Sequence, residues 1–432
     1  MNLIKKIRLK YLLTIMIANI IFFLILSLSY AIPNQNIRDN IADSLSVLKK
    51  EGEYYKPIFG NKLEFASSYT LDNFTDSLLL NVCYDLESDN FNIFERASAN
   101  SRYRNKGSII GNLESVIKGE QEANSTYERY WFGNVAILRP LLTFFNYQTI
   151  RYLNYIVIFA LFMIAFYLIS KNNGFKIALA FAISLLFMGL PIIPLSLQYT
   201  PVCIITLSVV IILNILYKKE YFKQVLPYIF LLTGCITAFM DLLSYPLLTF
   251  GMPMIILLVL ESKEQKTAKE YFKDFLRMGV LWSLGYFMTF FLKWIIASIV
   301  LNKNVIESAW KQFIYRSDIT SWKVSKLKKK KKNFGLYFNN IVISFIAIYY
   351  LIYIVKIIKS LKNKNIVIKK ENFSLVIVIA IVALTPYIWY LIFNNHSSVH
   401  SWMTYRIQAI TMMGIIIIPM ILTGKDLNNK IN

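Results

Sequence analysis

Hydrophobic runs of about 20 residues, separated by short polar or charged segments, recur along the whole chain. A helix of that length crosses the hydrocarbon core of a bilayer, and the runs lack the alternation of a membrane β-strand. The pattern therefore predicts an all-α integral membrane protein with about ten transmembrane helices. The predicted spans are 11–31, 149–170, 176–197, 200–217, 225–241, 245–261, 276–300, 336–358, 373–393 and 405–423.

The first apolar run follows four basic residues, as it does in a secretory signal peptide. It is longer than the core of a usual signal peptide, and no small-x-small cleavage site follows it. We therefore expect residues 1–31 to be retained as the N-terminus and first span, followed by a large loop (32–148) and a multi-span domain (149–432).

Two amphipathic helices are predicted within the loop 32–148. Apolar residues recur at helical spacing in both segments, and such helices are suited to lying on a membrane surface. The intervening stretch 52–106 is rich in Asn, Ser, Tyr and acidic residues, as a polar site would be. The apolar positions are Ile37, Ile41, Leu45 and Leu48 in one helix, and Ile109, Ile110, Leu113, Val116 and Ile117 in the other.

The distribution of basic residues predicts the orientation. With both termini in the cytoplasm, every predicted inner segment carries at least two Lys or Arg residues, whereas the outer turns 198–200 and 242–244 carry none. The predicted outer loop 301–335 departs from this rule, because it holds ten basic residues, including the run Lys328–Lys332. We expect that run to contact anionic lipid, a phosphate-bearing substrate or a wall polymer, unless the loop is simply solvated.

The composition excludes a soluble protein, because 56% of the residues are hydrophobic and the mean hydropathy is +0.48. A net charge of +22 would suggest nucleic acid in a soluble chain, but here the basic residues flank the spans, so we expect a membrane partner and no nucleic acid. Cys83, Cys203 and Cys235 lack metal-ligand spacing, and no metal site is assigned. The abundance of Lys, Ile and Asn suggests an AT-rich bacterium, and hence its plasma membrane.

Acidic residues of the first loop are the candidate catalytic bases. Asp72 and Asp76 precede the apolar stretch Leu78–Leu80, which could hold a carboxylate at the membrane surface, where it could deprotonate an acceptor hydroxyl. The same Asp-Asn-Phe-Thr segment is equally typical of a turn or a helix cap. The competing acids are Asp39, Asp43, Asp85 and Glu87.

The only two histidines, His396 and His400, lie four residues apart at the mouth of the last span. Residues four apart share a helix face, so both imidazoles and Arg406 could converge on a phosphate. The alternative is a polar cap at the membrane interface around Trp402 and Tyr405.

Two further regions contain candidate binding residues. Arg129, Tyr130 and Arg139 precede the second span, where aromatic rings and arginines could grip sugar and phosphate or merely anchor the chain. Asp241 and Lys293 are charges at or within predicted spans. They could pair with each other, or Lys293 could bind a lipid-linked phosphate.

Taken together, these segments resemble a group of bacterial membrane proteins found among cell-surface polysaccharide genes. Their layout is similar to that of the GT-C superfamily of polyprenyl-phosphate-dependent glycosyltransferases. The segments are Asp72-Asn73-Phe74-Thr75-Asp76, Arg129-Tyr130-Trp131 with Arg139-Pro140-Leu141-Leu142, Asp241-Leu242, Lys293-Trp294, Asn395-His396-Ser397 with His400, and Thr404-Tyr405-Arg406.

The resemblance implies a glycosyltransferase that moves a sugar from a polyprenyl-phosphate carrier to a cell-surface glycan or lipid-linked acceptor on the extracytoplasmic face. In that scheme Asp76, or else Asp72, activates the acceptor, and the basic residues neutralise the departing phosphate. The cofactor requirement is left open, with a divalent cation as the one candidate. A lipid-linked oligosaccharide flippase and a polysaccharide polymerase are the alternative functions.

Overall fold

The computed structural model describes residues 2–57, 69–87, 90–264, 266–317, 333–362 and 370–423. Within these ranges the ordered elements are helices, and the single β-bridge, between Arg102 and Ser125, is isolated. The predicted all-α class is therefore confirmed.

The helices fall into three groups. The long helices are α1 (Asn2–Ser29), α7 (Tyr147–Asn173), α8 (Phe175–Phe187), α9 (Thr200–Leu216), α10 (Phe222–Met240), α11 (Leu248–Glu261), α12 (Ala268–Val300), α15 (Asn340–Lys362), α16 (Lys370–Ile392) and α19 (Ala409–Leu422). The helices of the first loop are α2 (Asn34–Glu51), α3 (Asn73–Tyr84), α4 (Ile93–Ala99), α5 (Ile109–Ile117) and α6 (Asn134–Leu142). The remaining ones are α13 (Val305–Ser317), α17 (Asn394–Val399), α18 (Ser401–Thr404), η2 (Leu190–Leu195), η3 (Ser262–Glu264) and η4 (Tyr405–Gln408).

Seven helical segments of the described chain are long and apolar enough to cross a membrane. They correspond to α1, α7, α10, α12, α15, α16 and the continuous stretch Ser401–Leu422. The other three predicted spans contain α8, α9 and α11, which are shorter than any of these seven segments. The chain is thus a multi-pass membrane protein by the length and composition of its helices, and the count of ten spans stays a prediction.

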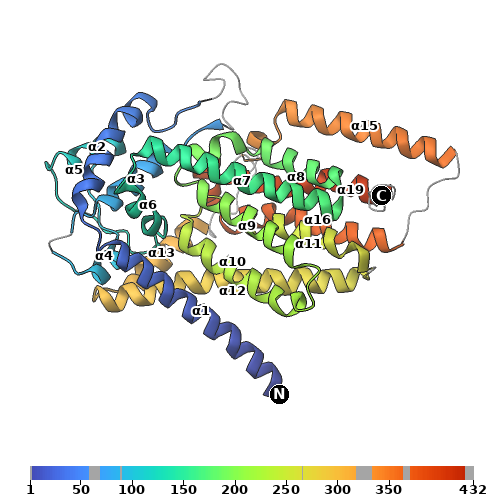
Figure 1. Ribbon diagram of the computed structural model, residues 1–432, viewed down its shortest axis with the longest axis horizontal. Helices are drawn as coiled ribbons and strands as arrows, with labels where there is room; N and C mark the ends of the chain where they lie inside the picture. The colour runs from blue at the N-terminus through green and yellow to red at the C-terminus, as the bar shows by residue number, and fades with distance from the viewer. Residues whose placement is uncertain are drawn as a thin grey trace.

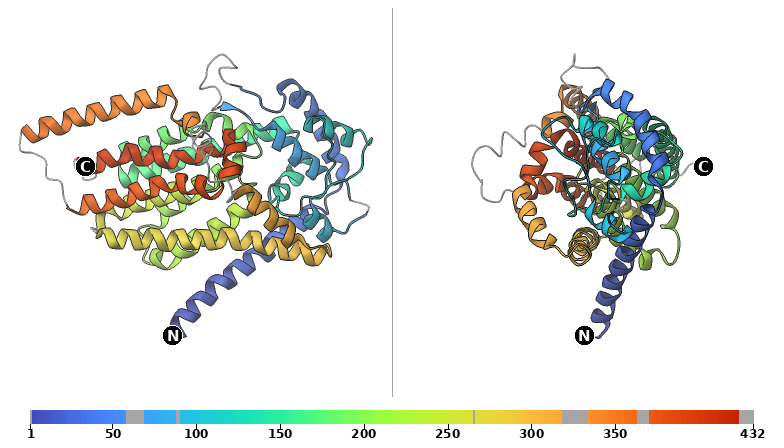
Figure 2. Two further views of the ribbon diagram at one scale, coloured as in Figure 1. Left: turned by 180° about the vertical axis from the view of Figure 1, so that it is seen from behind. Right: turned by 90° about the vertical axis from the view of Figure 1, so that its left-hand side faces the viewer.

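The long helices form a bundle, and α2–α6 gather at one end of it as a separate head (Figure 1). The same arrangement is visible from behind, where α13 lies between the head and the bundle (Figure 2). The N-terminal end of α1 and the C-terminal end of α19 both point away from the head (Figures 1 and 2).

Both amphipathic helices predicted for the first loop exist, as α2 and α5. Their apolar faces do not lie on a membrane surface, however, because the protein itself covers them. Ile37, Ile41 and Leu48 of α2 and Leu113 and Val116 of α5 are fully buried in the core of the head. The spacing of apolar residues correctly predicts both helices. The expectation that their apolar faces lie on a membrane surface is wrong, because these faces pack inside the protein.

Glycines allow α10 and α12 to approach each other closely. A Cβ atom on Gly234 would lie 2.1 Å from the carbonyl oxygen of Trp282, and one on Gly285 would lie 2.2 Å from that of Leu231. Small residues that let two backbones meet are typical of helix pairs in membranes. This contact fixes α12, whose C-terminal end continues past the bundle to the head.

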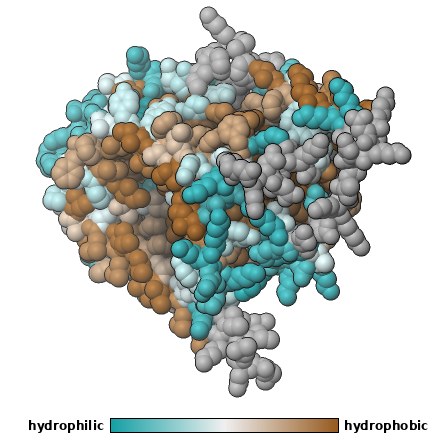
Figure 3. Space-filling view, turned by 45° about the vertical axis from the view of Figure 1, so that its right-hand side comes forward, coloured by the Kyte–Doolittle hydropathy of each residue, from teal (hydrophilic) through white to brown (hydrophobic). Residues whose placement is uncertain are grey.

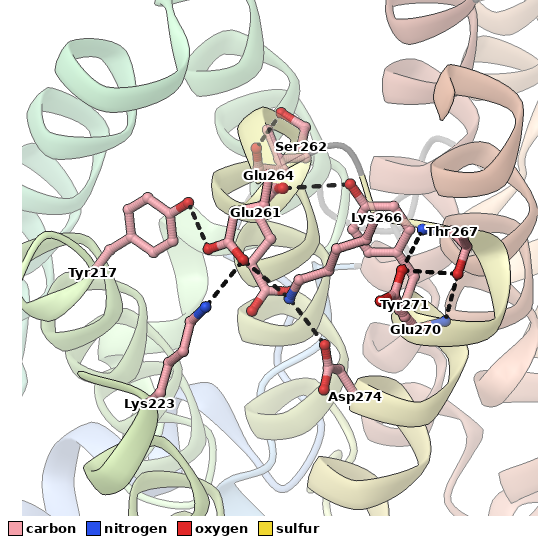
Figure 4. A network of polar contacts seen from close by, with 11 residues as sticks. Tyr217, Lys223, Glu261, Ser262, Glu264, Lys266, Thr267, Glu270, Tyr271 and Asp274 are labelled. Atoms are coloured by element: carbon pink, nitrogen blue, oxygen red, sulfur yellow. Dashed lines mark hydrogen bonds and ion pairs between the residues drawn. The ribbon is translucent and has the colours of Figure 1, made fainter. Parts of the chain in front are cut away.

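The surface changes character along the bundle. Figure 3 shows broad hydrophobic areas beside a hydrophilic region at the end away from the head. At that end Lys266 forms ion pairs with Glu261 at 2.8 Å and Asp274 at 2.9 Å, and Lys223 pairs with Glu264 at 3.3 Å (Figure 4). This network ties together α10, α11 and α12 where their connecting turns meet water.

Candidate functional site

An apolar groove runs along one side of α12. One part, of about 270 Å³, is lined by α12, α13 and Phe393, and a second part, of about 530 Å³, lies between α12 and α16. Phe287 and Met288 line both parts, so the two parts adjoin each other along α12. Only the part nearer the head contains charged side chains, those of Arg129 and Arg316.

The segment 127–133 is fastened to α12 by two tryptophan side chains. The indole of Trp294 donates to the carbonyl oxygen of Arg129 at 3.0 Å, and the indole of Trp131 donates to that of Thr289 at 2.9 Å. These bonds hold Arg129 at the head end of the groove, beside Tyr130.

Three arginines gather around two tyrosines at this end of the groove. The guanidinium of Arg102 lies 4.6 Å from the ring centroid of Tyr127, and that of Arg129 lies 5.2 Å from it. The guanidinium of Arg316 lies 6.0 Å from the ring centroid of Tyr130. Within the described ranges none of the three forms an ion pair with a carboxylate, in contrast to Arg96 and Arg151. The cluster is therefore a concentration of positive charge with room for an anion.

His396 is a neutral structural partner of this cluster. Its Nδ1 accepts a hydrogen bond from Arg316, so its other ring nitrogen, Nε2, carries the proton and donates to the carbonyl oxygen of Leu243 at 2.7 Å. Burial, with help from the charge of Arg316, lowers the pKa of His396 well below its ordinary value.

His400 stands next to His396, with the ring centroids 4.7 Å apart. Burial and the nearby Arg316 lower its pKa to about 4, so this imidazole is also neutral at ordinary pH. The two imidazoles lie side by side, as their spacing predicts, and the arginine that contacts His396 is Arg316; their predicted convergence with Arg406 on a phosphate stays a prediction. The expectation that they supply positive charge to a phosphate is wrong.

Arg406 is fully buried, and it is linked to the histidines through Trp402, whose ring contacts His400. Its guanidinium lies 3.9 Å from the ring centroid of Tyr199, and its Nη1 donates to the carbonyl oxygen of Trp402 at 2.5 Å. Among the described residues, its Nε and Nη2 have no hydrogen-bond partner. A buried guanidinium with free donors is costly unless it serves a ligand or a function.

Among the acidic residues predicted for the first loop, Asp72 has the surroundings best suited to a catalytic base. It is the N-cap of α3, where it accepts from the backbone amide of Thr75 at 3.2 Å and from the Thr75 hydroxyl at 2.7 Å. Burial raises its pKa to about 7, a shift that the hydrogen bonds of Thr75 and the charge of Arg406 oppose. A carboxylate with such a pKa is suited to accepting a proton near neutral pH.

Asp76 is held by four donors and is therefore a structural residue. Its carboxylate accepts from the Tyr147 hydroxyl at 2.6 Å, the Ser196 hydroxyl at 3.1 Å and the amides of Leu197 and Gln198, both at 3.0 Å. These bonds join α3 to α7 and to the turn before α9. No lone pair is left for a substrate, so the geometry disfavours the predicted role of Asp76 as base.

Arg139 and Lys293 are also engaged by the protein itself. Arg139 donates to four acceptors at the ends of α1 and α3, among them the carbonyl oxygen of Ser29 at 2.8 Å. The ammonium of Lys293 donates to the carbonyl oxygens of Ala97 and Ser98 at 2.9 and 3.0 Å, at the C-terminal end of α4. Both residues hold the head on the bundle, and the substrate contacts predicted for them are not supported.

The predicted pairing of Asp241 with Lys293 is wrong. Asp241 ends α10 and accepts from the backbone amide and the hydroxyl of Ser244, which closes the turn after that helix. The carboxylate is buried within its own turn, beside the Leu243 carbonyl that holds His396. It supports the site indirectly.

The competing acids have partners or positions of their own. Asp39 accepts from Gln35 on the exposed side of α2, Asp85 pairs with Arg96 at 2.7 Å, and Glu87 accepts from Asn90. Asp43 also lies on α2. The run Lys328–Lys332 lies outside the described residues.

Sequence reasoning missed Arg102, Arg316, Tyr54 and Tyr199. Arg316 lies in the basic segment 301–335, where the lysine run dominated the pattern. Its signal was the sequence Tyr315-Arg316 at the end of an amphipathic helix.

The fold and the site define a multi-pass helical membrane protein with an apolar groove that ends in two arginines, neither of which has a carboxylate partner among the described residues. No protein-family model matches the chain, and no curated protein or solved structure matches it significantly. Among the described residues, no group of three or more His, Cys, Asp or Glu side chains is placed to hold a metal ion. These ranges thus offer no ligand set for the divalent cation that the resemblance left open.

Proposed function

We propose that the protein is a membrane glycosyltransferase that moves a sugar from a polyprenyl-phosphate carrier to a glycan acceptor. One observation carries this proposal: a hydrophobic groove along α12 ends in Arg129 and Arg316, in a chain whose buried Asp72, with a pKa near 7, lies within reach of the charge of Arg406. A polyprenyl phosphate has the matching chemistry, a long apolar chain that ends in an anionic headgroup.

The isoprenoid chain lies along Phe287, Phe291 and Trp310 in this proposal, and its phosphate meets Arg129 and Arg316. Aromatic and aliphatic walls favour an isoprenoid by apolar burial, and arginine binds phosphate through a planar fork of donors. The neutral His396 orients the Arg316 guanidinium through its Nδ1.

Asp72 acts as the general base in a single displacement. The acceptor oxygen forms a bond to the anomeric carbon of the sugar while the bond from that carbon to the phosphate oxygen breaks. The acceptor proton moves to Asp72, and the electron pair of the broken bond stays on the phosphate. Arg406, close enough to Asp72 for its charge to act on the carboxyl group, and the arginines of the groove stabilise the developing negative charge.

The head is extracytoplasmic in this proposal, because the helix ends and turns away from it carry Lys171, Lys218, Lys219, Lys223 and Lys263. A flippase would need charged side chains along a path open to both faces. The described groove has them only at its head end, which favours a transferase.

Proteoliposomes supplied with a panel of radiolabelled polyprenyl-phosphate sugars and glycan acceptors test the proposal. Intact protein is expected to transfer label, and Arg316→Ala is expected to lose at least about tenfold in activity by weakening carrier binding. Lys311→Ala is the matched control, because Lys311 is an exposed cation on α13 that pairs only with Glu307, at 2.6 Å, among the described residues.

Equal loss in both variants, or label moving across the bilayer without product, would remove the transferase proposal. The second result would identify a flippase.

A further inference from the structure

Three aromatic rings form a cluster beside Asp72, on the side of the head. The rings of Tyr54 and Phe74 lie parallel, with centroids 6.2 Å apart, and the ring of Trp402 meets Tyr54 edge-on at 5.1 Å. Tyr54 is 45% exposed and Phe74 is 37% exposed. Rings that are packed together and partly exposed provide an ordered aromatic surface that a ligand can reach.

The backbone holds this cluster next to the carboxylate. The amide of Phe74 donates to the carbonyl oxygen of Glu53 at 3.2 Å, and the amide of Leu71 donates to that of Tyr55 at 2.8 Å. These bonds fix the segment carrying Tyr54 against the segment carrying Asp72. Burial, with the charges of Asp72 and Glu53, raises the pKa of Tyr54 to about 12, as expected for a phenol close to a carboxylate.

Trp402 joins the cluster to the rest of the site. Its ring also contacts His400, with centroids 5.2 Å apart, and its carbonyl oxygen accepts from Arg406. Its indole Nε1 is buried and has no hydrogen-bond partner among the described residues. A buried indole N–H group usually has a hydrogen-bond partner. Because that of Trp402 has none among the described residues, it can donate to a ligand hydroxyl.

A polar pocket of about 350 Å³ begins two residues before Tyr54. It is lined by Gly52 and Glu53 from the end of α2, and by Lys49, Ser108 and Glu114. Lys49 and Glu114 pair across it at 2.8 Å and are partly exposed. Three charged side chains line this pocket, as expected for a surface that binds a hydroxyl-rich ligand.

We infer that Tyr54, Phe74 and Trp402 form a platform for a pyranose ring of the acceptor glycan, and that the polar pocket beside Gly52 receives the adjoining sugar. The inference rests on the proposed function only in calling this sugar the acceptor. Aromatic faces bind the C–H faces of pyranoses, and the hydroxyl groups around the ring need polar partners. The platform adjoins Asp72 and the pocket adjoins the chain segment of Tyr54, so a sugar on the platform would present a hydroxyl to the base.

Saccharide binding by the purified full-length protein in detergent tests the inference without requiring turnover. Tryptophan fluorescence and calorimetry are measured with a panel of soluble disaccharide and trisaccharide methyl glycosides. We expect at least one of them to bind, and Tyr54→Ala and Phe74→Ala each to weaken its binding by about tenfold, the scale of one lost aromatic contact. Tyr55→Ala is the matched control. Tyr55 follows Tyr54 in the sequence and its ring is 39% exposed, but among the described residues this ring makes no ring contact with the cluster.

Binding of none of the saccharides, or equal loss in Tyr55→Ala and Tyr54→Ala, would overturn the platform. In the transfer assay, Phe74→Ala is expected to raise the acceptor KM while the donor KM stays unchanged. Transfer with an unchanged acceptor KM would refute the platform and leave the proposed function standing. Saccharide binding with no transfer from any carrier would leave the platform standing and refute the proposed function.

Discussion

Replacing Asp72 by Asn separates the proposed role of this residue as a general base from its role as the N-cap of α3. Asp72 caps α3 by accepting from Thr75, and Asn is as good an N-cap residue as Asp. The substitution therefore keeps the helix start and removes only the ionisable group. Replacement by Ala would confuse the two effects, because loss of the cap alone costs about 1 kcal/mol.

The magnitude follows from the pKa of about 7 that burial gives this carboxyl group. At about pH 6 roughly one tenth of Asp72 is ionised, and at about pH 8 roughly nine tenths, so transfer is expected to rise about tenfold between them. In Asp72→Asn the rate falls by about 10²–10⁴-fold, the usual contribution of a general base, and this rise with pH disappears.

Stability changes in the opposite direction. Because the folded-state pKa of Asp72 is raised from 3.8 to about 7, the folded protein binds the proton more tightly, and the contribution of Asp72 to stability falls as pH rises from about 4 to about 7. Each unit corresponds to about 1.4 kcal/mol, so ionised Asp72 costs the fold roughly 4 kcal/mol at about pH 8. Asp72→Asn is therefore expected to melt at a higher temperature than the intact protein at pH 8, and at a similar one only below about pH 4, where Asp72 is protonated in both states.

Two measurements check this reasoning: the pH profile of transfer in proteoliposomes, and thermal unfolding in detergent across the same pH range. Asp241→Asn is the control, because Asp241 is equally buried but is held inside its own turn. A pH profile that persists in Asp72→Asn and vanishes in Asp241→Asn would refute the assignment of the base. So would an Asp72→Asn protein of normal activity.

Three further substitutions test the structural assignments by thermal unfolding in detergent. Asp76→Asn is expected to lower stability by about 1–3 kcal/mol for each donor left unsatisfied, while the KM of the folded fraction for the carrier is unchanged. A changed KM with normal stability would instead support a catalytic role for Asp76. Lys293→Met is expected to loosen the end of α4 and expose the head to protease, and selective loss of carrier binding would contradict this. Gly285→Ala is expected to cost several kcal/mol, because its Cβ would lie 2.2 Å from the Leu231 carbonyl oxygen, whereas Gly279→Ala, 3.3 Å from a ring carbon, is expected to be tolerated.

The hydrophobic runs predicted the helices well, because the length and composition of a span are local properties of the chain. The amphipathic period of α2 predicted a helix but not what it packs against. An apolar face buried in a protein core and one buried in a membrane surface produce the same spacing. Ile37 and Ile41 are therefore consistent with either, and only the fold shows that the head covers them.

The charged residues were found by sequence, but their roles depended on contacts that no local pattern contains. Lys293 binds carbonyl groups 195 and 196 positions away, and Asp76 binds a turn about 120 positions away. A charge within a hydrophobic segment indicates that some partner exists, and it does not say whether that partner is the protein or a ligand. Arg316 was missed because its significance lies in having no carboxylate partner among the described residues, which is a property of the fold alone.

The balance of charge at the site argues for an anionic ligand. Arg102, Arg129 and Arg316 gather around Tyr127 and Tyr130, where both nearby histidines are neutral, and Arg406 is buried within reach of Asp72, which is about half ionised near pH 7. Other buried arginines are matched by carboxylates or by several carbonyl groups, as Arg151 of α7 and Arg139 of the head are. Charges left without such partners in a poorly solvated place cost free energy, and a phosphate headgroup entering from the groove would recover it. A neutral sugar alone would not, which is why the carrier phosphate and not the saccharide accounts for the arginines.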